Sequence, residues 1–334
     1  ITGVHAVDNV ESPSRLDDRP YSFEDLDLTA GILTNLIDTY NHQSKVLSML
    51  QRYKENVMEK MRQLEQRDPV MITNEMGTCM VTSPINQLMV PVFLASYPGS
   101  GSGMLRDLIE AMTGIKTGEK MRRNNVIAIK TSYPTEQKDT HPGFFNKDMK
   151  RTILLIRNPL NAIFSYHNHI FWQENDLMQH SLRAPQEAWE QWRDKNFLNE
   201  LDKWIEHLHY WFNTVKGNQR MILNYEWLIH SGRGPRQGTR VAMFLDGTDG
   251  EQTSAPEATV PCLWFRSVKV INPTAITDDH PTFTTKQLEL AAQKLSVVGR
   301  EYTYDLLLGP VLKSYFEHTV MQIEGQKTES AETR

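Results

Sequence analysis

The residues with the clearest chemical potential form a glycine-rich turn near position 100. An apolar run of strand type at 91–96 leads into this turn, and a helical pattern begins at Met104. The backbone N–H groups of such a turn can surround an anion, with the positive end of the following helix behind them. Glycines permit a close approach of the backbone, and serine hydroxyls donate further hydrogen bonds. The predicted phosphate-binding residues are Pro98, Gly99, Ser100, Gly101, Ser102 and Gly103.

Two common nucleotide-binding loops are excluded by the residues around this turn. A nucleoside-triphosphatase loop ends in Gly-Lys-Ser/Thr, whereas this turn ends in Gly103 and Met104. The dinucleotide fingerprint needs Gly-x-Gly-x-x-Gly and an acidic residue about 20 positions later, and the glycine spacing here does not match it. A turn that serves only the fold, without a ligand, remains the alternative explanation.

A second candidate anion site lies at the end of a later apolar strand, 152–156. Arg157 follows this strand directly, Pro159 marks the first turn of a helix, and Ser165 lies eight positions after the arginine. A guanidinium binds two phosphate oxygens at once and a serine hydroxyl supplies a third hydrogen bond, so the pair suits a terminal phosphate. The alternative is a salt bridge of Arg157, with Ser165 on the solvent side of the helix.

The elements that must position these residues follow the pattern of an α/β fold. After Pro69, short apolar runs alternate with helical patterns, which is typical of a parallel sheet. The sequence therefore predicts a P-loop-like parallel sheet flanked by helices and preceded by a long helical stem. Strands are expected at 91–96, 126–130, 152–156 and 221–223, and helices at 104–112, 160–169, 196–214 and 240–245.

The chain divides by composition into four segments. They are a flexible lead-in at 1–27, a helical stem at 28–68, a main domain at 70–323 and a disordered tail at 324–334. Apolar residues recur at heptad positions through the stem, which predicts a coiled coil that pairs two chains into a homodimer or holds the next domain away from a surface. A single amphipathic helix packed on its own domain fits the pattern equally well.

Composition and charge exclude several classes of function. The 334 residues include 36 lysines and arginines against 41 aspartates and glutamates, a formal charge of −5, which argues against nucleic-acid binding. No apolar run reaches the roughly 18 residues of a membrane-spanning helix, so the chain as given is expected to be soluble. It begins with Ile1, and a signal peptide or membrane anchor could precede it. Cys79 and Cys262 allow one disulfide bridge and leave its existence open.

Two further clusters have simpler explanations than a site. The histidine pairs at 167 and 169 and at 207 and 209 have the spacing of metal ligands, but on a helix such residues point to different faces. No metal is therefore expected. Aromatic residues recur at helical intervals between 189 and 211, which predicts core packing. A pocket in which an acceptor sugar stacks on aromatic rings is the alternative.

The two anion-binding segments together resemble the nucleotide-binding motifs of the sulfotransferases that use 3′-phosphoadenosine 5′-phosphosulfate (PAPS). The turn at 97–102 is similar to the family's 5′-phosphosulfate loop, and Arg157 with Ser165 is similar to the pair that binds the 3′-phosphate. Tyr225, which is followed by glutamate, resembles a third element whose tyrosine lies near the adenine. The glycine after Tyr-Pro resembles the branch that includes the WSC-domain sulfotransferases, and the likeness extends over about 90–320.

The resemblance implies roles for residues at and beyond the end of the second strand. Lys130 would neutralise charge on the migrating sulfuryl group. Where the family has a histidine as general base, this chain has Ser132, so His141 is the candidate substitute base, or else a surface histidine. Many cytosolic relatives also have a lysine where Gly99 stands, which helps to neutralise the bridging oxygen as the sulfuryl group leaves. In this chain, backbone N–H groups and another cation must provide that neutralisation.

The resemblance thus implies an enzyme that moves a sulfuryl group from PAPS to an acceptor hydroxyl, on a carbohydrate or another alcohol, without a metal. A glycan is the expected acceptor class, and the Golgi lumen or another secretory compartment is the expected location. Two alternatives remain. One is a nucleotide-binding homologue with impaired catalysis, because Ser132 is a poor base, and the other is a nucleotide kinase, against which the missing Gly-Lys-Ser/Thr argues.

Overall fold

The chain divides into two compact units, Ile1–Asp68 and Pro69–Arg334. The computed structural model describes Glu55, Cys79 and Ser254 together with the ranges 91–118, 126–135, 151–177, 183–215, 219–246, 259–271 and 282–332. The predicted lead-in at 1–27 lies outside the described residues. So does the predicted stem at 28–68, except for Glu55.

A parallel sheet forms the centre of the second unit. Its strands are β1 (Val92–Ser96), β2 (Ala128–Thr131), β3 (Thr152–Ile156) and β4 (Arg220–Asn224). They lie in the order β2-β1-β3-β4, and every neighbouring pair is parallel. The predicted parallel α/β sheet is therefore confirmed, with strand ends that differ from the prediction by at most two residues. Because the strands are parallel, their carboxyl ends meet at one edge, and the turn after β1 lies between the segments that follow β2 and β3.

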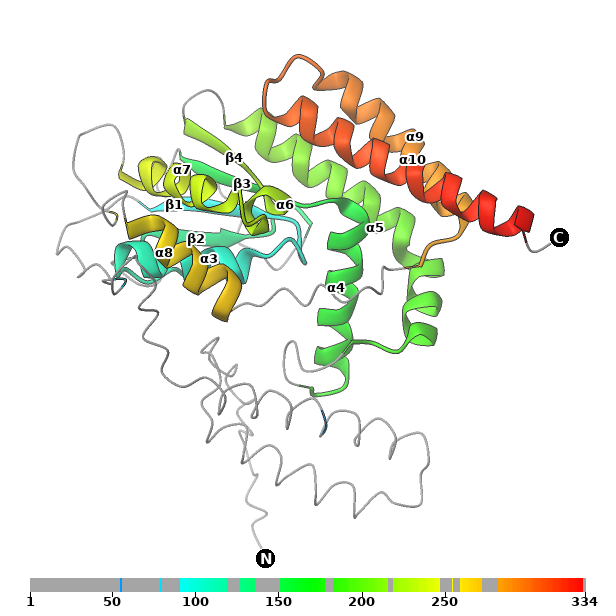
Figure 1. Cartoon of the computed structure of the whole chain (residues 1–334), viewed down its shortest axis with the longest axis horizontal. Helices are drawn as coiled ribbons and strands as arrows, with labels where there is room; N and C mark the ends of the chain where they lie inside the picture. The colour runs from blue at the N-terminus through cyan, green and yellow to red at the C-terminus, as the bar shows by residue number, and fades with distance from the viewer. Residues whose placement is uncertain are drawn as a thin grey trace, which may run out of the picture. The chain divides into compact units, whose positions relative to one another are not determined.

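Helices cover both faces of the sheet (Figure 1). Successive strand residues are buried on opposite sides: Phe93 and Ala95 join one core cluster, whereas Val92 and Leu94 join the other. The first cluster is covered by α4 (Pro159–Glu174), α5 (Gln186–Thr214), α9 (Thr285–Glu301) and α10 (Leu308–Glu332). The second is covered by α3 (Ser102–Thr113), α7 (Gly234–Asp246), α8 (Val260–Trp264) and the π-helical η4 (Phe265–Ile271).

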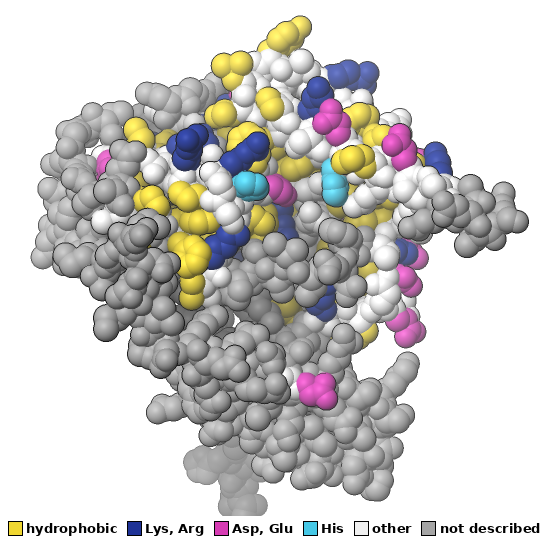
Figure 2. Space-filling model, viewed as in Figure 1, with side chains coloured by type: hydrophobic (Ala, Val, Ile, Leu, Met, Phe, Trp, Pro, Cys, Tyr) yellow, Lys and Arg dark blue, Asp and Glu magenta, His cyan; other side chains and the backbone are white. Residues whose placement is uncertain are grey.

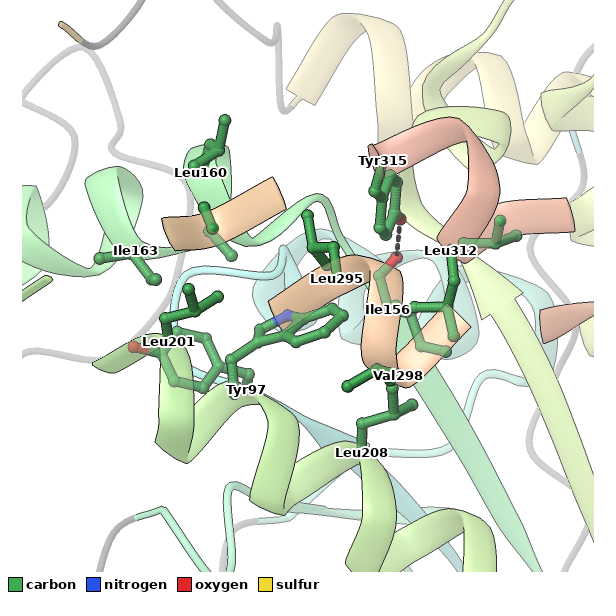
Figure 3. Close-up of a cluster of buried hydrophobic side chains, with 14 of the residues drawn as sticks. Tyr97, Ile156, Leu160, Ile163, Leu201, Leu208, Leu295, Val298, Leu312 and Tyr315 are labelled. Carbon is green, nitrogen blue, oxygen red and sulfur yellow. Dashed lines mark hydrogen bonds between the residues drawn. The ribbon is translucent and has the colours of Figure 1, made fainter. Parts of the chain in front are cut away.

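The aromatic residues between 189 and 211 belong to the core. Trp189, Trp204 and Trp211 are each at most 2% exposed and lie in the cluster between the sheet and α5. The interpretation as core packing is thus confirmed for these three rings. Figure 3 shows part of the same cluster, in which side chains from the sheet edge, α4, α5, α9 and α10 meet.

Helix α7 begins earlier than its sequence suggests. A helix was expected only at 240–245 because the preceding stretch is rich in glycine, yet α7 starts at Gly234. A Cβ at Gly234 would lie 2.2 Å from the Trp264 ring, and one at Gly238 would lie 3.1 Å from Val260. The glycines therefore allow α7 to pack directly against α8, and packing outweighs their low helix propensity.

The C-terminal segment is helical where disorder was expected. The predicted disordered tail at 324–334 is corrected by α10, which continues to Glu332. Gln326 explains why, because its Nε2 donates to the carbonyl of Phe283 (2.8 Å) and its Oε1 accepts from the hydroxyl of Thr285 (2.8 Å). Lys327 adds an ion pair with Glu289 at 3.3 Å. The polar residues at the end of α10 therefore form hydrogen bonds to α9 and to the residues just before α9, and their polarity does not indicate disorder.

A disulfide bridge joins Cys79 to Cys262, with their Cα atoms 5.8 Å apart. It settles the question that two cysteines left open, and it ties the segment before β1 to α8. None of the helices within the described part of the chain is both long enough and apolar enough to cross a membrane.

Candidate functional site

The turn after β1 has a left-handed backbone at two glycines. The φ angle is +78° at Gly99 and +89° at Gly101, a region that other residues rarely adopt. The N–H of Ser100 donates to the carbonyl of Tyr97 (3.1 Å), which closes the turn. Helix α3 then begins at Ser102, with Gly101 as its N-cap residue. The predicted succession of strand, glycine turn and helix is present at this place.

The glycines at 99 and 101 are also required by close packing. A Cβ on Gly99 would lie 2.2 Å from the carbonyl oxygen of Ala162 and 2.7 Å from the backbone nitrogen of Tyr166, both in α4. A Cβ on Gly101 would lie 2.5 Å from the ring of Tyr225. The turn is therefore fitted against the backbone of α4 on one side and an aromatic ring on the other. No other side chain, including the lysine of many cytosolic sulfotransferases, can occupy position 99 without moving α4.

Polar groups of the turn are available for an anion. The Ser100 side chain is 1% exposed, and its hydroxyl has no hydrogen-bond partner among the described residues. The first N–H groups of a helix lack partners within the helix, so those of Ser102 to Met104 point out of the start of α3. Gly103 is exposed, with open space around a Cβ at that position. A buried hydroxyl without a partner costs free energy unless a ligand or water satisfies it, so the turn fits a bound oxyanion.

Arg157 lies against this turn. Its Nη1 donates to the carbonyl of Gly99 at 2.7 Å, and its Cζ lies 4.3 Å from the centre of the Tyr225 ring. The buried Nε of Arg157 has no hydrogen-bond partner within the described ranges. On the opposite side, the indole N–H of Trp204 donates to the backbone carbonyl of Arg157 (3.2 Å). The structure thus brings together the residues that follow β1, β3 and β4.

The start of α4 explains how Ser165 reaches the same region. The side chain of Asn158 caps the helix by accepting from the N–H of Leu160 (3.0 Å), and Pro159 occupies the first turn, as predicted. Because the turn at Gly99 packs on the backbone between Ala162 and Tyr166, the helical turn that carries Ser165 lies beside the glycine turn. Ser165 itself is half-buried.

The end of β2 holds the other predicted site residues. Lys130 is half-buried and pairs in register with Leu94 of β1, while Ser132 is 3% exposed and follows the last residue of the strand. Just beyond them, the carbonyl of Tyr133 accepts from the indole N–H of Trp211 (2.7 Å), which fixes this segment on α5. The third predicted residue, His141, lies outside the described residues.

Sequence reasoning assigned no role to two carboxylates that support the site, those of the buried Glu200 and the half-buried Glu226. Glu200 of α5 is 5% exposed and accepts from the Tyr97 hydroxyl and from Lys203 Nζ, each at 2.7 Å. The second carboxylate, that of Glu226, accepts hydrogen bonds from Asn158 and Asn224, the neighbours of Arg157 and Tyr225 in sequence. For Glu200 a signal existed, because its position falls among Phe197, Leu201 and Trp204 on the apolar face of a helix.

The histidine pairs face different surroundings. His207 is buried, and burial lowers its pKa from 6.5 to about 3. His209, two positions later, shares a hydrogen bond with the hydroxyl of Tyr302 (2.6 Å). Burial likewise lowers the pKa of His167 to about 4, because its ring lies among those of Trp189 and Trp192. Within the described ranges, no group of three or more histidine, cysteine, aspartate or glutamate side chains is arranged to hold a metal ion.

Exposed cations lie on the segment that follows β4. Figure 2 shows Lys and Arg side chains over α6 (Tyr225–Ile229) and α7. The exposed cations of this segment include Arg233 and Arg236. Their field would favour the approach of an anionic ligand to the edge of the sheet where the glycine turn lies.

Comparison with known proteins gives relatives over part of the chain. No protein-family model matches it. Over 165 residues it is 27% identical to "WSCD family member CG9164" of Drosophila melanogaster, which covers 45% of this chain and 49% of the relative. Over 152 residues it is 29% identical to "WSCD family member GA21586" of Drosophila pseudoobscura pseudoobscura, covering 41% and 45%. The match therefore spans about half the length of these curated relatives.

Among solved structures, the chain is similar to mouse sulfotransferase SULT7A1 complexed with PAP. The TM-score is 0.41 and the sequence identity is 19%, and the similarity covers 68% of this chain and 88% of the mouse protein. The two sequence relatives confirm the resemblance to the WSC-domain branch that the motifs at Gly99 and Arg157 predicted.

Proposed function

We propose that this protein is a sulfotransferase that moves a sulfuryl group from PAPS to a hydroxyl of an acceptor. The observation that carries the proposal is a single cluster. The turn carries the unpartnered hydroxyl of Ser100, its Gly99 carbonyl accepts from the guanidinium of Arg157, and Gly99 and Gly101 fit it closely against α4 and Tyr225. An arginine, a buried hydroxyl and the start of a helix are the groups that proteins use to bind phosphate and sulfate.

The donor would be held through its two anionic ends. The 5′-phosphosulfate would bind to N–H and hydroxyl groups of the turn between Gly99 and Gly103, and the 3′-phosphate would bind to Arg157 and Ser165. Support comes from the free Nε of Arg157 and from the position of Ser165 on the turn of α4 that touches Gly99. The Tyr225 ring, which lies between Gly101 and Arg157, would border the adenine.

The chain's own groups would carry the electrostatic part of the reaction. PAPS, when bound, supplies the sulfuryl group and a nucleotide as leaving group. The N–H groups at the start of α3 and the ammonium of Lys130 would stabilise the negative charge that develops on the transferring oxygens. The acceptor hydroxyl must also lose a proton to a base, and His141 is our candidate for that base. No metal is part of the proposal.

A second candidate function is a nucleotide-binding protein with impaired catalysis. The observation that favours it is the identity and burial of Ser132, which stands at the expected position of the general base and is 3% exposed. A serine hydroxyl does not accept a proton near neutral pH. Turnover of PAPS by the native chain in the presence of a suitable acceptor would remove this candidate.

The acceptor and the location are also proposals. We expect a carbohydrate or another alcohol, with a glycan as the first class to screen. The Cys79–Cys262 bridge supports the Golgi lumen or another secretory compartment, because disulfides persist in oxidising compartments and are rare in the cytosol. Pairing of two chains through the stem at 28–68 would be tested by the oligomeric state of the chain with and without that segment.

Binding of 3′,5′-bisphosphoadenosine, the desulfated product of the donor, tests the proposal directly. In titration calorimetry Arg157→Ala is expected to weaken binding by about 2 kcal/mol or more, which is roughly 30-fold, because charge-assisted contacts to phosphate are lost. Arg151→Ala is the matched control, because Arg151 lies at the opposite end of β3 from Arg157. The Arg151 guanidinium carbon lies 4.5 Å from the centre of the Phe244 ring. Equal affinity of the Arg157 variant and the native chain would refute the assignment.

A further inference from the structure

The carboxylate of Glu226 receives three hydrogen bonds behind the proposed nucleotide site. Its Oε1 accepts from the backbone N–H of Asn158 (2.9 Å), and its Oε2 accepts from Asn224 Nδ2 (2.9 Å) and from the hydroxyl of Tyr315 (2.8 Å). Asn224 Nδ2 also donates to the Tyr315 hydroxyl at 2.7 Å. We call Glu226, Asn224 and Tyr315 the carboxylate brace.

The carboxylate brace joins the sequence neighbours of Arg157 to the sequence neighbours of Tyr225, the two residues proposed to bind the ligand. Asn158 follows Arg157 directly, while Asn224 and Glu226 flank Tyr225. The Tyr315 hydroxyl also lies 3.4 Å from the carbonyl of Ile156, which precedes Arg157. Figure 3 shows the Tyr315 ring pointing from its helix toward this carbonyl. The ends of β3 and β4 are thus held together around the pair Arg157 and Tyr225, through two backbone groups on the β3 side and two side chains on the β4 side.

Tyr315 comes from a distant part of the chain and keeps its proton. It lies on α10, is 3% exposed, and joins residues that precede it by about 90 positions or more. Burial and the nearby Glu226 carboxylate raise the pKa of Tyr315 well above 10, while Arg157 acts in the opposite direction. The phenol therefore remains a hydrogen-bond donor at neutral pH, and the charge of Arg157 lies near enough to influence it.

We propose that Glu226 and Tyr315 are positioning residues that hold Arg157 and Tyr225 in the geometry that binds the nucleotide, so that nucleotide affinity depends on the last helix of the chain. The inference rests on the proposed function, because it assigns to these residues the support of the same nucleotide site. Neither residue needs to touch the ligand. Loss of one bond of the carboxylate brace would loosen the connection between the segments after β3 and β4, which would disturb the contact of Arg157 with Gly99 and Tyr225.

The test uses Tyr315→Phe in the full chain, with affinity for 3′,5′-bisphosphoadenosine measured by calorimetry. We expect a loss of five- to tenfold, the effect of a lost hydrogen bond on the geometry of the site. Tyr302→Phe is the matched control, because Tyr302 is also a buried tyrosine whose hydroxyl is hydrogen-bonded, but to His209. The control should lower thermal stability and leave the affinity unchanged. Should Tyr315→Phe fail to fold, Glu226→Gln is measured in the same way.

A double-mutant cycle separates positioning from a general loss of stability. In an Arg157→Ala background, Tyr315→Phe should weaken binding by a clearly smaller factor than in the native chain, because one of the two groups that it positions is gone. Independent, additive losses would overturn the inference, and so would native affinity of the Tyr315 variant. A native chain that does not bind 3′,5′-bisphosphoadenosine would instead overturn the proposed function, and the positioning role with it.

Discussion

The carboxyl edge of the sheet has two halves that are built differently. At the ends of β1, β3 and β4, the backbone of the glycine turn packs closely on other groups. Gly99 packs on the backbone of α4, Gly101 packs on the Tyr225 ring, and Arg157 donates a hydrogen bond to the turn. At the end of β2, the proposed site consists of the side chains of Lys130 and Ser132 on a regular strand end. The first half depends on shape that few substitutions can preserve. The second depends on chemical groups that can be exchanged while the strand stays in place.

This difference separates binding from catalysis. If the first half holds the nucleotide and the second carries out the transfer, changes at β2 should alter turnover and leave nucleotide affinity nearly intact. Changes at the glycine turn should remove both. Two variants test this separation, and a pH series then tests the packing behind the first half, in order of decreasing expected effect.

Gly99→Lys tests whether the glycine turn tolerates the lysine of many cytosolic sulfotransferases. We expect no detectable nucleotide binding and a loss of about 3 kcal/mol or more in the free energy of unfolding, because the Cβ would lie 2.2 Å from the Ala162 carbonyl oxygen at a φ of +78°. Denaturant unfolding and calorimetry measure the two effects. Gly103→Ala is the control for stability, since space around it is open. A stable Gly99→Lys variant that binds nucleotide would show that the close packing is not a constraint.

Lys130→Ala tests the half of the edge at β2. Turnover should fall about 100-fold because a charge that stabilises the transition state is removed, whereas the affinity for 3′,5′-bisphosphoadenosine should change by no more than about threefold. Lys116→Ala serves as the comparison, because that side chain is 80% exposed and pairs with Glu110. A parallel loss of affinity and turnover would mean that Lys130 belongs to the nucleotide-binding half.

Low pH should lower the stability of the packing around His207, which lies beside the ends of β1 and β3. His207 lines a cavity of about 10 Å³ together with Tyr97, Trp204 and the end of β3. Its pKa is lowered from 6.5 to about 3, so its contribution to stability is complete above pH 6.5 and is lost as the pH falls toward 3. Between pH 7.5 and 5 this histidine alone should cost about 2 kcal/mol of unfolding free energy.

Urea unfolding at several pH values measures this slope. The slope should flatten in His207→Phe and stay unchanged in His230→Ala, because His230 is exposed. An equally steep slope in the His207 variant would assign the acid sensitivity to other groups, such as His167, which burial also keeps neutral.

Much of this architecture could be predicted from the residues, because local patterns determine it. Apolar runs located all four strands, and the positions of Arg157 and Pro159 placed the arginine at a strand end and the proline at a helix start. The turn itself was predictable because glycines that follow a strand favour the left-handed backbone observed at Gly99 and Gly101. The core role of the tryptophans followed from their helical spacing.

The remainder depended on contacts between distant segments, which no local pattern encodes. Nothing near Glu226 indicates that Tyr315, 89 positions later, donates to it. The polar residues after Glu324 suggest disorder until their partners on α9 and at Phe283 are known. In the same way, the glycines at 234 and 238 suggest a loop until Trp264 is seen to fill the space beside them. In the last two cases, tertiary contacts outweighed local propensity.

The hydrogen bond from the Trp204 indole to the carbonyl of Arg157 has a practical consequence. Indole emission depends on the polarity and hydrogen bonding around the ring. Trp204 is therefore an intrinsic fluorophore in direct contact with Arg157, which is proposed to bind the donor. Although the chain has seven tryptophans, subtracting the spectrum of a Trp204→Phe protein would isolate this one emitter. Ligand occupancy and its kinetics could then be followed optically, without a label and without knowledge of the acceptor.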